Sequence, residues 1–319
     1  MSRYKSSWRF LINLYKLTLK KKFSSPPKVV LFAFSLLWLD PFGIYEKLTS
    51  SLDNEKSPKG NMYWQKMTPD QLVDEADKLY SRGEYLQVYE ILNRMRYNGN
   101  PEVQWRICRV LFKMSGDEKF SSNMREEMIS EAYILINMAL SLDDSNANIH
   151  KWMAIIIDAK TGYDGVIEKI KSYETIRFHM ERAIELNPND MVVLYMLGKW
   201  NYEMSRLTRF QRWIAKVFYH HDPPMSHYRD AYEFLMRSAE LQTNEYYIPT
   251  FYILGKTCIK LGHFYRARYY LQYAAFLPPR TDYEEKCARK SKSLVIQLDK
   301  YDLASESIFY DFPNFTDQM

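Results

Sequence analysis

A chain of 319 residues, of which 46% are apolar, is long enough to bury a substantial core, and its 10 glycines and 13 prolines favour long helices over many short strands. Three widely spaced cysteines without a CxxC pair argue against a disulfide framework and a zinc finger, and predict buried thiols in a reducing compartment. The net charge of +5 comes from residues 1–39, which hold eight lysines and arginines and no acid. The rest of the chain is therefore acidic, which argues against nucleic acid as a partner.

Residues 1–45 form a basic and apolar N-terminal arm. Its longest apolar run, Val29–Leu39, has 11 residues and would reach about 17 Å as a helix, short of the roughly 30 Å of a hydrocarbon core. Three interpretations stay open: a mitochondrial targeting segment, an amphipathic anchor in a membrane interface, and an apolar arm that packs on the fold. The arm also carries a compact basic patch that could contact an acidic surface, made of Lys20, Lys21 and Lys22.

Residues 46–67 are predicted to be a linker, because Ser-Ser and Ser-Pro-Lys-Gly sequences interrupt them. Residues 68–298 are predicted to form a domain of helical repeats. Residues 299–319 are an acidic and aromatic C-terminal tail, which we expect to cover the exposed end of the repeats.

The clearest repeat runs from Ile248 to about residue 280. If Ile248 is position 1, small residues occupy positions 8 and 20, where two antiparallel helices approach closely (Gly255 and Ala267). Gly262 at position 15 turns the chain, and Pro279 at position 32 ends the second helix. This pattern resembles the tetratricopeptide repeat.

Four further hairpins match the pattern less completely, starting near residues 69, 102, 147 and 191. We therefore predict an all-α fold, an α-solenoid of about five tetratricopeptide-like helical hairpins. Insertions are expected between the helices of the second, third and fourth hairpins. The longest, about residues 207–227, contains a predicted short helix over 209–219 that Asp222-Pro223-Pro224 would end.

Several motifs resemble those of the regulator of microtubule dynamics family over about residues 70–298. They include Glu102-Val103-Gln104-Trp105-Arg106, His150-Lys151-Trp152-Met153-Ala154, Leu197-Gly198-Lys199-Trp200-Asn201 and Leu254-Gly255-Lys256-Thr257. The resemblance implies a protein of the cytoplasm and cytoskeleton that binds microtubules or tubulin and acts on the spindle, with some members on mitochondria. The alternative is a mitochondrial membrane-tethered adaptor at organelle contacts, which binds protein or lipid partners.

The first helices of stacked hairpins line a concave groove, and in tetratricopeptide proteins their inward-facing positions include 5, 9 and 12. These positions hold basic and phenolic side chains: Arg106, Lys151, Tyr195, Lys199, Tyr202, Tyr252 and Lys256. A tyrosine followed four residues later by a lysine occurs in the last two repeats, on one helical face. Such a groove suits an extended acidic peptide, for example the acidic C-terminal tails of tubulin. The alternative is a solvated face whose lysines pair with neighbouring acids.

The sequence contains none of the GxGxxG, P-loop, GxSxG or HExxH motifs, so we expect neither an enzyme nor a bound cofactor. The cluster His220-His221-Asp222 with His227 lies in the long insertion and is expected to be a solvated loop rather than a metal site. His150 and His179 are expected to be structural histidines with satisfied hydrogen bonds.

Overall fold

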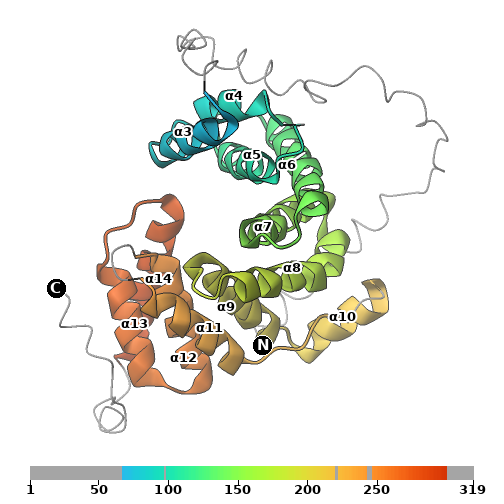
Figure 1. Cartoon of the computed structure of the whole chain (residues 1–319). Helices are drawn as coiled ribbons and strands as arrows, with labels where there is room; N and C mark the ends of the chain where they lie inside the picture. Colours follow the sequence, from blue (N-terminus) through green and yellow to red (C-terminus); the bar gives the residue numbers. More distant parts are fainter. Residues whose placement is uncertain (1–66, 97, 220–221, 243–245, 300–319) are drawn as a thin grey trace. The chain divides into compact units, whose positions relative to one another are not determined.

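The computed structural model describes residues 67–96, 98–219, 222–242 and 246–299, and all regular structure in these ranges is helical (Figure 1). The chain divides into two compact units, residues 1–41 and 42–319, and every described residue belongs to the second. The basic arm with its lysine patch, nearly all of the linker, and the C-terminal tail beyond residue 299 lie outside the described residues. No helix in the described ranges is long and apolar enough to cross a membrane.

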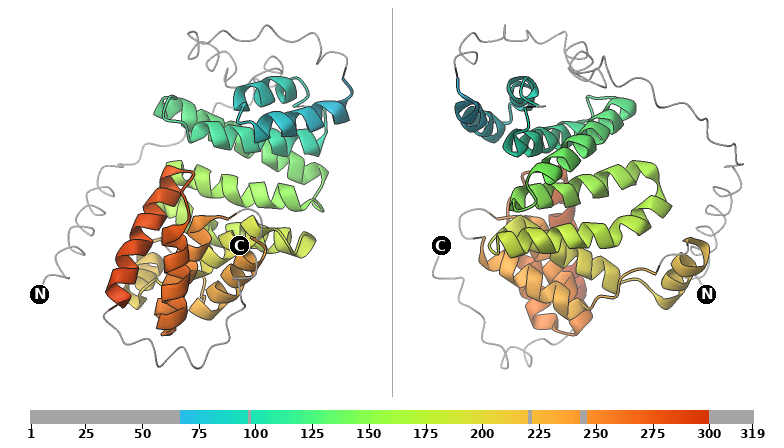
Figure 2. Two further views of the ribbon diagram at one scale, coloured as in Figure 1. Left: turned by 90° about the vertical axis from the view of Figure 1, so that its left-hand side faces the viewer. Right: turned by 45° about the vertical axis from the view of Figure 1, so that its right-hand side comes forward.

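The helices form five successive hairpins, each packed on the next, and a final helix (Figures 1 and 2). The hairpins are α3 (Pro69–Ser81) with α4 (Tyr85–Asn93), α5 (Pro101–Ser115) with α6 (Ser122–Leu142), α7 (Ala147–Asp164) with α8 (Val166–Leu186), α9 (Met191–Ser205) with α11 (Tyr228–Glu240), and α12 (Ile248–Leu261) with α13 (Phe264–Phe276). The final helix is α14 (Asp282–Leu298), and α10 (Arg209–Tyr219) lies in the connection between α9 and α11. The predicted all-α solenoid of tetratricopeptide-like hairpins is confirmed.

The insertions differ from the prediction in the third hairpin. Its helices α7 and α8 have 18 and 21 residues and meet at the single residue Gly165, whose φ of 103° accommodates the reversal. The extra residues therefore lengthen the paired helices instead of forming a loop. In the fourth hairpin the insertion does contain the predicted short helix, with the predicted bounds.

Polar side chains define where most helices begin. Thr68 forms a capping box with Gln71 at the start of α3, and Asn100, Ser121 and Asn146 accept backbone N–H groups at the starts of α5, α6 and α7. Asp190 accepts the N–H groups of Val192 and Val193 at the start of α9. These side-chain caps determine the residue at which each of these helices begins, by satisfying backbone N–H groups that have no partner within the helix.

The apolar core consists of two clusters that share α9. Val193, Leu197 and Trp200 join the cluster of the first three hairpins, whereas Tyr195 and Tyr202 join the cluster of the last two hairpins and α14. All three cysteines are buried, as predicted, and burial raises the pKa of the Cys258 thiol to about 12. The repeat domain is thus continuous, because α9 contributes one face to each cluster.

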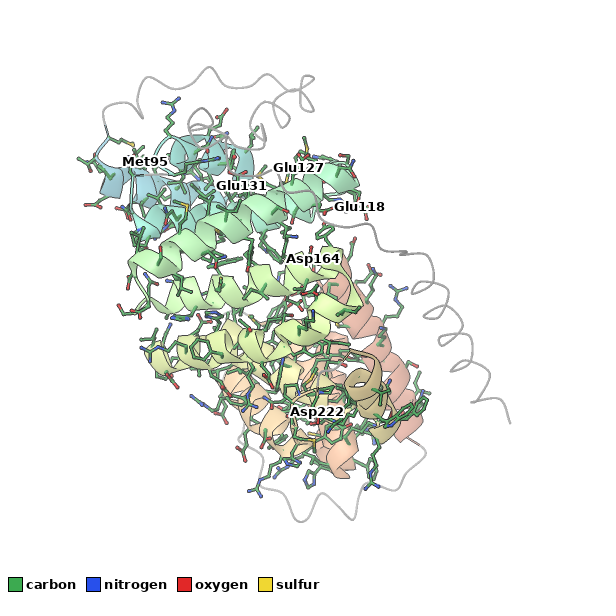
Figure 3. All side chains as sticks on the ribbon, turned by 90° about the vertical axis from the view of Figure 1, so that its right-hand side faces the viewer. Met95, Glu118, Glu127, Glu131, Asp164 and Asp222 are labelled. Carbon is green, nitrogen blue, oxygen red and sulfur yellow. The ribbon has the colours of Figure 1, made fainter. Side chains whose placement is uncertain are left out.

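One ion pair is fully enclosed in the first two hairpins. Arg96 Nη2 lies 2.5 Å from Glu131 Oε1, and both side chains are only 2% exposed (Figure 3 labels Glu131 on α6). The hydroxyl of Tyr89 donates to the same carboxylate at 3.2 Å. Because the charge is paired and hydrogen-bonded, it can be tolerated in the core, but neither partner could be removed without a large cost.

Candidate functional site

The structure places two of the predicted groove cations in ion pairs between hairpins. Arg106 Nη2 lies 2.8 Å from Asp77 Oδ2, and its Nη1 lies 2.5 Å from Glu102 Oε2. Burial opposes ionisation of Asp77, but hydrogen bonds from Arg106 and Arg109 hold the pKa of this carboxyl below its usual value. At Arg106 the predicted groove cation is therefore paired with neighbouring acids, as in the alternative interpretation of the groove.

Lys151 is similarly engaged. Its Nζ lies 2.8 Å from Asp190 Oδ2, the carboxylate that also caps α9. Lys151 and Asp190 therefore join the third hairpin to the fourth, and neither Arg106 nor Lys151 presents an unpaired charge to a ligand.

The predicted groove tyrosines Tyr195, Tyr202 and Tyr252 are largely buried in the packing between helices. Tyr195 is 6% exposed and Tyr202 is 2% exposed. The ring of Tyr195 packs edge-on against Tyr247 at 5.0 Å between centroids, and burial raises the pKa of both phenols, that of Tyr247 to about 12.

Helix α14, whose docking position was not predicted, contributes to this burial together with Tyr247 and Tyr228. It packs on α12 and α13 (Figure 1). Its Tyr283 hydroxyl lies 3.5 Å from that of Tyr195. The Nζ of Lys199 lies 5.7 Å from the centroid of the Tyr283 ring. Thus α14 covers part of the face that α9 and α12 would otherwise offer to a peptide.

Lys256 is the predicted groove residue with the most distinctive surroundings. Its Nζ lies 4.8 Å from the ring centroid of Tyr202 and 4.9 Å from that of Tyr252, so the ammonium group contacts two aromatic faces. Desolvation lowers the pKa of Lys256, although Glu203 acts in the opposite direction. Among the described residues, no carboxylate lies within ion-pair distance of Lys256.

Lysines of three helices influence the thiol of Cys287 on α14. Burial raises the pKa of this thiol, whereas Lys290, Lys199 and Lys256 each pull it down. Lys256 on α12 and Lys290 on α14 border a common cavity, and Lys199 on α9 lies against the ring of Tyr283 on α14. The two predicted tyrosine–lysine pairs are therefore brought together, with α14 as an added wall.

A cavity of about 370 Å³ opens in this region. Its walls come from α9, α12 and α14, and the lining residues are Tyr202, Tyr252, Lys256, Ile259, Lys260, Lys290, Ser293 and Leu294. No acidic residue lines it in the described part of the chain. We call it the lysine cavity; its ammonium groups, phenol rings and aliphatic side chains suit an anionic ligand with apolar parts.

Lys260 and Lys290 also line the cavity, and neither was predicted as a site residue. Lys260 follows Lys256 by four residues and shares its helical face, so the helical spacing carried that signal. Lys290 depends on the docking of α14, for which the sequence shows no local signal.

A second cavity, of about 440 Å³, lies between the third hairpin and α9. Its lining is mostly apolar, including Phe112, Ile155, Tyr173, Ile176, Met180, Met196 and Trp200. It differs from the lysine cavity because Lys169 and Lys199 are accompanied there by Asp158 and Glu203. The charges are therefore mixed, and the cavity has no preference for anions.

The histidines are structural, as predicted, but their pairing was not foreseen. His150 Nδ1 lies 2.9 Å from His179 Nδ1, and His150 Nε2 lies 2.9 Å from the carbonyl oxygen of Asp144. Burial and the neighbouring His150 lower the pKa of His179 to about 4.

The described ranges contain no group of three His, Cys, Asp or Glu residues that could hold a metal ion. His220 and His221 lie outside these ranges.

Fold and site together define a tetratricopeptide-like α-solenoid with a basic cavity at its C-terminal end. A thermophilic tetratricopeptide-repeat protein from Thermus thermophilus has a similar solved structure, with a TM-score of 0.47 and 11% identity over 70% of this chain and 98% of that one. The family model "Regulator of microtubule dynamics protein 1-3" matches residues 72–300, so the chain belongs to this family.

Relatives support the same assignment. Regulator of microtubule dynamics protein 1 from Mus musculus is 30% identical over 229 residues, which cover 72% of this chain and 74% of the relative. The protein of the same name from Bos taurus is 30% identical over 71% of each chain. Regulator of microtubule dynamics protein 3 from Xenopus laevis is 28% identical over 65% of this chain and 45% of its own length.

Proposed function

We propose that this chain is a non-enzymatic repeat protein that binds microtubules or tubulin by holding acidic segments, such as the tubulin tails, in the lysine cavity. The observation that carries the proposal is the position of Lys256 between the rings of Tyr202 and Tyr252, beside Lys260 and Lys290. None of the described residues that line the cavity is acidic.

Holding these ammonium groups close together, away from water, costs free energy. Lys256 is partly desolvated, and its pKa is lowered, so the folded protein disfavours its ammonium form relative to water. A carboxylate in the cavity would compensate this cost and that of the repulsion from Lys290. The apolar atoms of Ile259 and Leu294 would contact the aliphatic parts of glutamate side chains.

The basic arm supplies a second contact in this proposal. Lys20, Lys21 and Lys22 would lie against the acidic microtubule surface, with an attraction that fades within roughly 8 Å at physiological salt. We accordingly expect the protein in the cytoplasm and on the cytoskeleton, including the spindle. The names of the relatives and of the family model support this role.

Co-sedimentation with polymerised tubulin tests the proposal. We expect the full chain to pellet with microtubules at low salt, and to remain in the supernatant when the acidic tails have been removed with subtilisin or when the salt concentration is raised. Absence of binding at low salt, or binding that is unaffected by tail removal, would contradict it.

A mitochondrial membrane-tethered adaptor is a second proposed function. The apolar arm, whose first 39 residues contain no acid, supports it, and the mostly apolar second cavity could accept a partner's apolar side chains or a lipid. This function predicts that removal of residues 1–45 releases the protein from mitochondria in cells. Unchanged mitochondrial location of the truncated protein would count against it.

A further inference from the structure

Helix α10 stands away from the stacked hairpins (Figures 1 and 2). Arg212 bonds it to the last turn of α9 and to the segment that follows α10. The guanidinium of Arg212 donates to the carbonyl oxygens of Pro223 at 2.7 Å, Pro224 at 3.1 Å and Met204 at 2.7 Å. Ala215, three residues along the same side, is only 5% exposed. The side of α10 that carries Arg212 and Ala215 therefore faces the protein.

The opposite side of α10 is apolar and faces solvent. Phe210 and Trp213 are both 53% exposed, and Val217 is 44% exposed. The rings of Phe210 and Trp213 stack, with centroids 6.0 Å apart and planes inclined by 18°. Spacings of three and four residues place these side chains in one stripe along the helix. A surface helix of a globular protein normally buries such a stripe against the core. In α10 the apolar stripe instead points away from the rest of the protein.

Cations flank the stripe. Arg209 and Lys216 lie on either end of the helix, and no acidic residue occurs within α10. The ammonium group of Lys216 lies 3.0 Å from Asp222, which Figure 3 labels, but both side chains are more than 60% exposed. An exposed pair of this kind contributes little stability, so Lys216 can exchange Asp222 for another anion.

We propose that α10 docks the repeat domain on the interface of an anionic lipid bilayer. Phe210, Trp213 and Val217 enter the boundary between headgroups and acyl chains, and Arg209 and Lys216 face the lipid phosphates. Phenylalanine and tryptophan together with flanking cations are the side chains that interfacial helices use for this contact.

The dimensions of α10 favour a bilayer over a protein partner. The helix has 11 residues and is about 17 Å long, so one of its sides offers far less than the roughly 800 Å² per partner of a stable protein interface. A bilayer needs no matching groove. This inference is independent of the lysine cavity, which belongs to other helices.

The test uses an environment-sensitive fluorophore, NBD, attached to the full chain at Val217→Cys. The three native cysteines are at most 3% exposed and should not compete for the label. A matched control carries NBD at Phe276→Cys, because Phe276 is 83% exposed and belongs to α13. Vesicles of phosphatidylcholine with phosphatidylserine should shift the emission at position 217 to the blue and raise its intensity, and leave position 276 unchanged.

The same labelled proteins distinguish membrane binding by α10 from membrane binding by the N-terminal arm, which is itself a candidate membrane segment. If the full chain floats with vesicles but the label at position 217 does not respond, the arm alone binds and the proposal is overturned. An equal response at both labelled positions, or a blue shift without vesicles that grows with protein concentration, would also overturn it.

A double substitution gives the quantitative readout. Phe210→Ser with Trp213→Ser should weaken vesicle binding of the full chain about tenfold, because two half-exposed rings no longer enter the interface. Phe276→Ser should leave binding unchanged. Equal binding of the double variant and the original chain would contradict the proposal, and unchanged circular dichroism of the variants verifies that the helices are intact.

Discussion

Gly198 on α9 lies directly against Leu235 on α11: a Cβ atom at Gly198 would come within 2.5 Å of the Leu235 Cγ. The same relationship recurs one repeat later, where a Cβ atom at Gly255 would come within 2.6 Å of the Leu271 Cγ. Both leucines are fully buried. The small residue at position 8 of the repeat therefore serves to admit a leucine of the partner helix, which explains its presence in both hairpins.

Gly198→Ala and Gly255→Ala should each destabilise the protein by about 1–3 kcal/mol, because the added methyl group overpacks the helix contact. Gly162→Ala is the matched control, since Gly162 lies in α7 and a Cβ atom there would have no neighbour within 4 Å. That change should stabilise the helix by about 0.5–1 kcal/mol. Urea denaturation measures all three, and equal effects at positions 198 and 162 would contradict the packing argument.

Glu131→Gln should cost about 3–5 kcal/mol, because it leaves the buried guanidinium of Arg96 without its counter-charge. The comparison is Glu181→Gln, which removes an exposed partner of Arg177 and should change the free energy of unfolding by less than about 1 kcal/mol. Thermal and urea unfolding report both values. A loss at position 131 as small as that at position 181 would show that the buried pair is not needed.

The His150–His179 pair predicts a pH dependence of stability. The pKa of His179 is lowered to about 4 in the fold by burial and by His150, whereas an unfolded histidine titrates near 6.5. The unfolded chain therefore binds more protons between these values, and stability falls as the pH decreases from about 6.5 towards 4. Above about 6.5 this contribution is constant. The slope should be roughly 1.4 kcal/mol for each pH unit.

Unfolding midpoints of the original chain and of His179→Gln, measured from pH 7.5 to 4.5, isolate this contribution from that of the carboxylates. The original chain should lose stability more steeply than the variant below pH 6.5. Parallel curves over the whole range would mean that the pKa of His179 does not differ between the folded and the unfolded chain.

The repeats and the helix α10 could be predicted from the sequence because their signals are local. Gly262, Ala267 and Pro279 mark one hairpin by their spacing, and the proline pair after Asp222 marks the end of the α10 connection. The lengthened third hairpin was not predicted, because additional residues within a helix and within a loop look alike when the helical periodicity is weak.

The candidate site was only partly predictable, because its charges depend on residues far away in the chain. Arg106 bonds to Asp77, 29 residues away, and Lys151 to Asp190, 39 residues away. Tyr195 contacts Tyr283, 88 residues away on α14. The periodicity of one helix gives the side on which a residue lies, but not the helix that will cover it.

The lysine cavity itself is tested most directly by the affinity of the full chain for a fluorescent glutamate-rich peptide, measured by anisotropy at low and high salt. Lys256→Met and Lys290→Gln should each weaken binding roughly three- to tenfold and reduce its salt dependence, as expected when one contacting ammonium group is lost. Lys171→Gln, which removes an exposed lysine of α8 that pairs with Glu168, should bind like the original chain. Equal affinities for all of these proteins, or an equal loss in the Lys171 variant, would contradict the assignment of this cavity as the site for acidic segments.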